Sequence, residues 1–162
     1  MIFIYTDGGL SKSEAFSKEG GVGAWSYILL QGDKVISKTC KAETNTTNNR
    51  MELIAAIEAL EALKKLNLPN EKVELITDSL YLKNGITIWT KGWERNDWKT
   101  SGGEPVKNKE LWLHLMDLDK VLKPKYSWVK GHSSGNKAAE HNSECDKMCQ
   151  EAIAKKKKEL GK

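Results

Sequence analysis

The sequence has few cysteines and no long hydrophobic run, and both absences narrow the classes of protein to which it can belong. Three cysteines in 162 residues are an odd number and too few for a disulfide framework, as expected in a reducing cytoplasm. Cys145 and Cys149 lack His or Cys partners at zinc spacing, so we interpret them as buried small hydrophobic residues. No apolar stretch approaches the roughly 20 residues that cross a bilayer. Residues 1–5 are too short and lack the basic flank of a signal peptide, so we expect a cytoplasmic protein without membrane contact.

Long linkers, solenoid repeats and low-complexity segments are also absent, apart from four consecutive lysines at 155–158. A chain of this length can bury a full core, and we expect a single domain over residues 1–162. The net charge of +4 is only a weak indication of a polyanionic partner. The lysine-rich helical tail, about 155–162, is interpreted as a solvated helix end that the helix dipole favours, with a nucleic-acid contact as the alternative.

Hydrophobic periodicity and turn residues predict an alternation of strands and helices. Strands are predicted at 2–8, 22–30, 34–42, 73–79 and 126–129, helices at 51–66, 111–121 and 138–160, and two short helices with a polar loop within 79–107. This order, β-β-β-α-β-α-β-α, indicates an α/β fold around a mixed sheet. A long connection that contains a helix joins the first and fourth strands, as a right-handed parallel crossover requires.

Two of the predicted strands end in the same way. Residues 2–8 and 73–79 are each an apolar run that closes on Thr-Asp and then a small residue. If the two strands lie parallel and adjacent, Asp7 and Asp78 lie side by side at the carboxyl edge of the sheet, where sites in such folds are found. Two carboxylates at that distance repel each other unless they share a proton or a metal ion. The sequence therefore indicates a metal site.

Two further acidic residues are predicted on helices beside buried positions. Glu52 stands near the start of its helix next to the inward-facing alanines, and the alternative is an acid that only satisfies the helix dipole. Asp146 shares a helical face with Asn142, Cys149 and Ile153, although ionised groups are rarely buried unpaired. Four converging acids would hold hard cations through oxygen ligands, with Mg²⁺ the expected ion. A pair of such ions roughly 4 Å apart suits an in-line displacement at phosphorus.

Five short motifs follow one another along the chain. They are Thr6-Asp7-Gly8, Thr47-Asn48-Asn49-Arg50-Met51-Glu52-Leu53, Thr77-Asp78-Ser79, Trp128-Val129-Lys130-Gly131-His132 and Cys145-Asp146. In this order they resemble type 1 ribonuclease H, from residue 2 to about 155, and the second motif is highly specific. The resemblance implies a ribonuclease H-like fold with a five-stranded mixed sheet of order 3-2-1-4-5 flanked by helices. It also implies a metal-dependent endonuclease that hydrolyses the RNA strand of RNA/DNA hybrids by a two-metal-ion mechanism, giving 5′-phosphate and 3′-hydroxyl ends.

The resemblance further implies a role for each residue of the site. Asp7 would bridge two Mg²⁺ ions that are held together with substrate, with Mn²⁺ as a substitute. Asp146 would complete the site of the ion that activates water, and Glu52 and Asp78 would hold the ion on the leaving-group side. His132 matches a loop histidine of the family that helps to move a proton or to release product, and the alternative is a solvated loop histidine.

A basic, tryptophan-rich segment extends over about residues 83–109. Four of the six tryptophans, Trp89, Trp93, Trp98 and Trp112, fall within 24 residues and are interleaved with lysines. Lysine and arginine pair with phosphates and indole rings pack against sugars or bases, whereas the alternative is a small secondary core. We expect both uses. The resemblance matches this segment to the family's basic protrusion, which grips the DNA strand.

Substrate contacts are also implied by the resemblance. Thr47 and Asn108 match a pocket for a DNA phosphate, Asn48 and Asn49 match minor-groove contacts, and Trp93 matches a sugar contact. The full set of expected substrate-binding residues is Thr47, Asn48, Asn49, Trp89, Trp93, Lys99 and Asn108. The expected partner is an RNA/DNA hybrid duplex, bound by a monomer.

The chain departs from the family pattern in three places. The loops after Asp7 and after His132 are longer than usual, and Leu80 stands where a polar group that touches substrate is common. Two other functions stay open. One is a DNA-cutting nuclease on the same fold, which the Asn48-Asn49 pair and the protrusion disfavour. The other is a catalytically weak hybrid-binding module, which the complete set of four acids disfavours.

Overall fold

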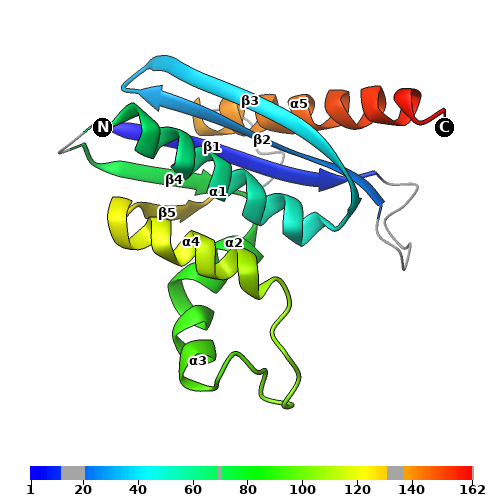
Figure 1. Ribbon diagram of the computed structural model, residues 1–162. Helices are drawn as coiled ribbons and strands as arrows, with labels where there is room; N and C mark the ends of the chain where they lie inside the picture. The colour runs from blue at the N-terminus through cyan, green and yellow to red at the C-terminus, as the bar shows by residue number, and fades with distance from the viewer. Residues whose placement is uncertain (12–20, 69–70, 131–136, 162) are drawn as a thin grey trace.

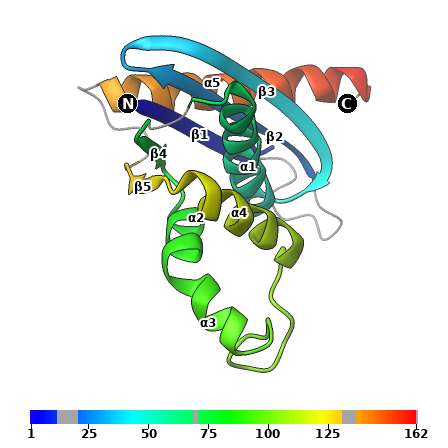
Figure 2. The ribbon, with the colours of Figure 1, turned by 60° about the vertical axis from the view of Figure 1, so that its left-hand side comes forward.

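A central sheet with helices on both faces forms the molecule, which a computed structural model describes over residues 1–11, 21–68, 71–130 and 137–161 (Figure 1). In chain order the elements are β1 (Ile2–Leu10), β2 (Gly21–Gln31), β3 (Lys34–Thr46), α1 (Asn48–Leu66), β4 (Val73–Thr77), α2 (Leu80–Asn84), the π-helical turn η2 (Gly85–Trp89), α3 (Thr90–Arg95), α4 (Lys109–Leu122), β5 (Lys125–Trp128) and α5 (Lys137–Glu159). Helix α1 covers one face of the sheet and packs against α4, and α5 covers the other face (Figures 1 and 2). Within the described ranges no helix is both long and apolar enough to cross a membrane.

The strand order is β3-β2-β1-β4-β5, which confirms the predicted order. Strand β1 pairs antiparallel with β2 and parallel with β4, in a register that runs from Ile2 opposite Val73 to Tyr5 opposite Ile76. Strand β5 extends the sheet in parallel with β4. Because β1 and β4 run the same way, the residues that follow their parallel pairing meet at one edge of the sheet.

The two faces of β1 enter different parts of the core, because successive side chains of a strand point to opposite faces. Ile2 and Ile4 are fully buried in the cluster that contains the apolar side chains of α1, and Tyr5 is buried with Cys145 on the side of α5. Cys145 and Cys149 are both free thiols and fully buried, which confirms their interpretation as small core residues.

Several boundaries differ from the predicted ones for identifiable reasons. Strand β3 continues to Thr46 because its pairing with β2 persists across two irregularities as far as Gly21. Helix α1 begins at Asn48, earlier than predicted, because the hydroxyl of Thr47 caps it by accepting a hydrogen bond from the backbone N–H of Arg50 at 3.2 Å. Strand β1 extends to Leu10 because it stays paired with β2 after β4 has ended.

The tryptophans of the segment that projects from the sheet extend the main hydrophobic core, because Trp112 is buried in the same cluster as the apolar side chains of β1 and α1, and Trp93 and Trp98 pack against that cluster. Trp112 is fully buried, and the ring of Trp93 lies 5.5 Å from it and 6.0 Å from each of Trp89 and Trp98, measured between centroids. Gly85 faces the ring of Trp112 so closely that a Cβ atom there would collide with it. A packing role for these tryptophans is therefore confirmed, but the predicted separate small core is wrong, since Trp112 joins the main cluster. Trp89 is 38% exposed at the surface.

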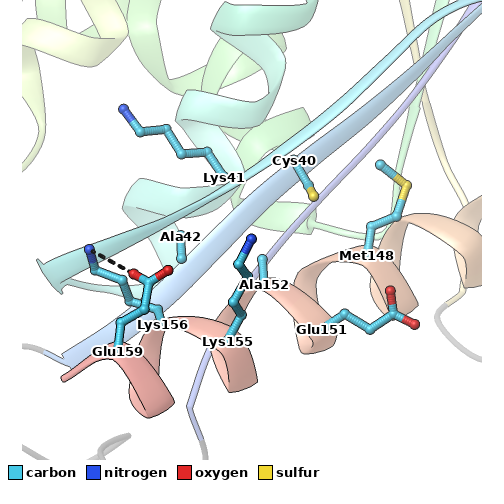
Figure 3. A pocket seen from close by; sticks show the side chains of 9 residues that line it. All are labelled: Cys40, Lys41, Ala42, Met148, Glu151, Ala152, Lys155, Lys156 and Glu159. Carbon is cyan, nitrogen blue, oxygen red and sulfur yellow. Dashed lines mark ion pairs between the residues drawn. The ribbon is translucent and has the colours of Figure 1, made fainter. Parts of the chain in front are cut away.

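The lysine-rich tail belongs to α5 and lies beside the edge strand β3. Lys155 and Lys156 line a hollow whose other walls include Cys40, Ala42 and Met148 (Figure 3). Lys156 is 3.9 Å from the carboxylate of Glu159. With a rise of about 1.5 Å per residue, these lysines lie roughly 15 Å along the helix from Asp146. The tail is therefore remote from the predicted acidic site.

Candidate active site

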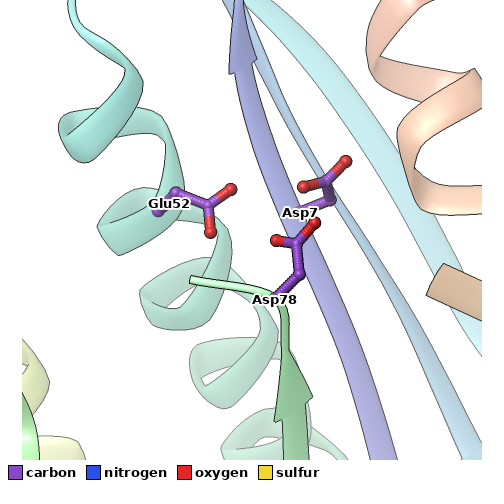
Figure 4. A group of neighbouring side chains, drawn as sticks. All are labelled: Asp7, Glu52 and Asp78. Carbon is purple, nitrogen blue, oxygen red and sulfur yellow. The ribbon is translucent and has the colours of Figure 1, made fainter. Parts of the chain in front are cut away.

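Three carboxylates from three different elements converge at the edge of the sheet (Figure 4). Asp7 lies in β1 just beyond its pairing with β4, Asp78 directly follows β4, and Glu52 projects from the first part of α1. One carboxylate oxygen from each residue lies within 4.8 Å of the other two. Asp7 and Glu52 are only 5% and 3% exposed, and Asp78 is half-buried. Glu52 thus joins the cluster that the two Thr-Asp strand ends predicted.

Gly8 allows α1 to approach β1 at this point. Its backbone N–H donates a short hydrogen bond to Oε1 of Glu52. A Cβ atom on Gly8 would collide with the backbone of Met51 and Glu52, so a larger residue would push the helix away. The other carboxylate oxygen of Glu52, Oε2, is buried and has no hydrogen-bond partner in the described structure. This oxygen is therefore available to a cation.

The electrostatics of the cluster disfavour three full charges. Burial, then the charges of Asp78 and Asp146, raises the pKa of Asp7 to about 8. Burial and then the charges of Asp7 and Asp78 raise the pKa of Glu52 well above its usual value. The pKa of Asp78 is also raised, chiefly by burial. A divalent cation would relieve this repulsion, and an all-carboxylate set of oxygens suits a hard ion such as Mg²⁺.

Asp146 is the fourth predicted acid and faces the same cavity from α5. It is half-buried and lies outside the group of three whose oxygens approach within 4.8 Å, but its charge acts on both Asp7 and Asp78. The cavity is lined by Asp7, Gly8, Gly9, Leu10, Asn48, Glu52, Asp78, Ser79, Leu80, Tyr81, Asp146 and Gln150. All four predicted acids therefore line one cavity.

Buried polar contacts hold α5 against the sheet beneath this cavity. The hydroxyl of Ser26, in β2, donates to the backbone carbonyl of Cys145 at 2.8 Å and lies 3.3 Å from the thiol of Cys149. Asn142 and Ile153 are each 5% exposed, so the face predicted to contain Asp146 is indeed turned inward. These contacts determine where α5 presents Asp146.

His132 lies outside the described residues, as do residues 12–20 of the loop after Asp7 and residues 133–136 of the loop after His132. Leu80 is 49% exposed and lines the acidic cavity at the start of α2. An apolar side chain thus stands beside the carboxylates where a polar group was expected from the family pattern.

A second cavity adjoins the first, and Tyr81 lines both. The second cavity is lined by Thr47, Asn49, Tyr81, Trp93, Thr100, Gly102, Glu104, Pro105, Val106, Lys107 and Asn108. Four of the predicted substrate residues, Thr47, Asn49, Trp93 and Asn108, therefore share one cavity although up to 61 positions separate them in the sequence. Asn48 lines the acidic cavity instead, and Trp89 and Lys99 are exposed without lining either.

No functional role was predicted for Gly8 or Tyr81. The role of Gly8 was indicated in the sequence by the small residue that follows each Thr-Asp pair, because the close approach of a helix backbone requires glycine at this position. Nothing in the local sequence marks Tyr81, since its position between the cavities depends on how α2 leaves β4.

The chain is similar to known proteins over most of its length. A sequence model described as RNase H matches residues 1–154. Ribonuclease H of Bradyrhizobium sp. (strain ORS 278) is 46% identical over 158 residues, which cover 95% of this chain and 90% of that protein. Ribonuclease H of Treponema denticola is 40% identical over 166 residues, which cover 95% of this chain and 98% of that protein.

Solved structures share the fold at lower sequence identity. The solution structure of the PFV RNase H domain has a TM-score of 0.77 at 21% identity and covers 94% of both chains. The crystal structure of LC11-RNase H1 in complex with RNA/DNA hybrid has a TM-score of 0.68 at 22% identity and covers 96% of this chain and 98% of that one.

Proposed function

This chain belongs to the ribonuclease H family, and from that membership we propose that it hydrolyses the RNA strand of RNA/DNA hybrids by a two-metal-ion mechanism. The observation that supports the proposal most strongly is the buried cluster of Asp7, Glu52 and Asp78 at the edge of the sheet, with Asp146 in the same cavity. Relatives at 40–46% identity are named Ribonuclease H, and a structure of the same fold is a complex with RNA/DNA hybrid. The proposed products have 5′-phosphate and 3′-hydroxyl ends.

The four acids fit a pair of Mg²⁺ ions, with Mn²⁺ as a substitute. The unpartnered Oε2 of Glu52 and the raised pKa values of the cluster are the features that a bound cation would satisfy. Asp7 would hold both ions, Asp146 one of them, and Glu52 and Asp78 the other. When bound, the ions supply an activated water and stabilise the leaving oxygen.

Side chains of the protein would position the hybrid and distinguish it from other duplexes. Thr47 and Asn108 would hold a phosphate of the DNA strand, Trp93 would pack on a sugar, and Asn48 and Asn49 would reach the minor groove. The acidic cavity must accept a strand with 2′-hydroxyls while the second cavity accepts a strand without them, so the enzyme can select a hybrid without reading its sequence. From its motif alone, His132 is proposed to move a proton or to assist product release.

The proposed chemistry is tested by the ends of the products. A hybrid with labelled RNA is incubated with Mg²⁺, and the fragments are ligated directly, without prior phosphorylation. We expect ligation of the fragments and no cleavage in EDTA. Fragments with 5′-hydroxyl or cyclic phosphate ends, or cleavage that persists in EDTA, would exclude the two-metal mechanism.

Replacement of Trp93 by alanine is expected to raise KM for the hybrid by about tenfold, because it removes the indole that would pack on a sugar. Stacking of an aromatic ring on a base is worth about 1–3 kcal/mol, and the sugar contact is expected at the lower end of that range. Since kcat at saturation depends on the acids and not on this ring, it should stay within about twofold. Steady-state kinetics on a fixed hybrid measure both constants.

Trp98→Ala is the matched control, because Trp98 is also half-buried beside Trp93 but does not line the second cavity. It should lower the melting temperature as Trp93→Ala does and leave KM unchanged. An unaltered KM in Trp93→Ala would assign Trp93 to packing against the hydrophobic core alone.

A further inference from the structure

The side-chain amide of Asn108 is fixed from both ends. Nη1 of Arg50 donates to its Oδ1 at 3.0 Å, and its Nδ2 donates to the hydroxyl oxygen of Tyr81 at 3.2 Å. A guanidinium has donors only, so the atom that faces Arg50 must be the oxygen of the amide. The NH₂ group of Asn108 is therefore directed toward Tyr81 and the second cavity, which both residues line.

This arrangement leaves hydrogen-bond donors on the cavity wall. The NH₂ group of Asn108 has a second hydrogen besides the one given to Tyr81. The Tyr81 hydroxyl accepts from Asn108 and so keeps its own hydrogen, and the Thr47 hydroxyl accepts from the backbone N–H of Arg50 at 3.2 Å and likewise keeps its own. Thr47, Tyr81 and Asn108 line the same cavity. Three donors on the wall of one cavity suit an anion with several acceptor oxygens, such as a phosphodiester.

Arg50 stands behind this wall and is itself held by a counter-charge. Its Nη1 lies 2.8 Å from Oε1 of Glu110, and the pair is partly exposed, at 34% for Arg50 and 65% for Glu110. The hydrogen bond and charge of Arg50 lower the pKa of Glu110. Arg50 does not line the second cavity. Arg50 is therefore better placed to hold Asn108 than to contact an anion directly.

We infer that Arg50, anchored by Glu110, is a positioning residue that orients the amide of Asn108 so that the second cavity offers donors to a backbone phosphate. Without Arg50 the amide can rotate and turn its oxygen toward the anion, which would repel it. The inference rests on the proposed function, since the phosphate belongs to the bound hybrid.

A double-mutant cycle tests this role. Arg50→Met, Asn108→Ala and the double variant are compared in steady-state cleavage of one hybrid with Mg²⁺. Each single variant is expected to raise KM by about threefold to tenfold, the value of one to two hydrogen bonds, with kcat nearly unchanged. The double variant should be no worse than Asn108→Ala, because Arg50 acts only through Asn108.

Lys107→Met is the matched control, since Lys107 is an exposed cation of the same cavity with no hydrogen bond to Asn108. Its effect on KM should add to that of Asn108→Ala. If the effect of Arg50→Met also adds fully, or if Arg50→Met leaves KM unchanged, the positioning role is wrong.

Salt dependence gives a second readout that does not depend on how well a variant folds. A residue that neutralises a phosphate contributes about 0.9 to the slope of log KM against log salt concentration. Arg50→Met should keep the slope of the parent protein. A slope that is smaller by about 0.9 would instead show that Arg50 contacts the phosphate directly. A parent protein that neither binds nor cleaves the hybrid would instead reject the proposed function itself.

Discussion

Asp7→Asn is expected to lower cleavage of the RNA strand by about 10³-fold or more, because it removes a charge that both proposed metal ions require. The same substitution should raise the melting temperature of the metal-free protein. Asp7 is buried, and the neighbouring charges of Asp78 and Asp146 contribute to raising its pKa to about 8, so its ionised form is unfavourable in the folded state. Asparagine has nearly the same shape and no charge, so activity and stability should move in opposite directions.

Single-turnover cleavage and thermal melts in EDTA measure the two effects. Asp117→Asn is the matched control, since Asp117 is an exposed acid on α4, far from the cluster in the sequence. It should change neither quantity. If Asp7→Asn cleaved as well as the parent, the assignment of Asp7 to the metal ions would be wrong.

The metal-free protein is expected to lose stability as the pH rises from about 5 to 8. The pKa of Asp7 is about 8 in the folded protein, against an ordinary value of 3.8, so between these values the folded state binds more protons than the unfolded state. Stability therefore falls with rising pH across this window, by an amount on the order of a few kcal/mol. The raised pKa values of Glu52 and Asp78 act in the same direction.

Mg²⁺ should oppose this loss, because a cation takes the place of the protons on the carboxylates. The increase in melting temperature on adding Mg²⁺ is therefore expected to be small at pH 5 and larger at pH 8. Melts at both pH values, with EDTA or Mg²⁺, measure the difference, and Asp7→Asn should show a flatter dependence in EDTA. A metal-free melting temperature that rose toward pH 8, with an equal Mg²⁺ shift at both values, would contradict the pKa assignments.

Much of the sheet could be predicted from the sequence because β1, β2 and β4 are largely apolar runs with clear ends. The parallel pairing of β1 with β4 follows from the Thr-Asp endings and the intervening helix, and the structure has that pairing. The boundary of β3 could not be predicted in the same way, because the strand continues through polar residues as far as Thr46, held only by its partner β2.

The residues of the acidic cluster could be predicted from the sequence, but the short distances between their carboxylates could not. The position of Glu52 depends on the absence of a side chain at Gly8, which lets the helix backbone approach the strand. The second cavity was harder to foresee, since it brings Thr47 together with Trp93 and Asn108. Arg50 and Asn108, 58 positions apart, meet only after α4 has packed on α1, so no local pattern could indicate their hydrogen bond.

The proposed function requires that the protein cleaves RNA only when the RNA is paired with DNA. The most direct test is cleavage of labelled RNA/DNA, RNA/RNA, DNA/DNA and single-stranded RNA with Mg²⁺, with EDTA as the control. We predict cleavage confined to the RNA of the hybrid and abolished by EDTA. Cleavage of duplex DNA would favour a DNA-cutting nuclease on this fold, and tight binding of the hybrid without cleavage would show a binding module; either result would contradict the proposed function.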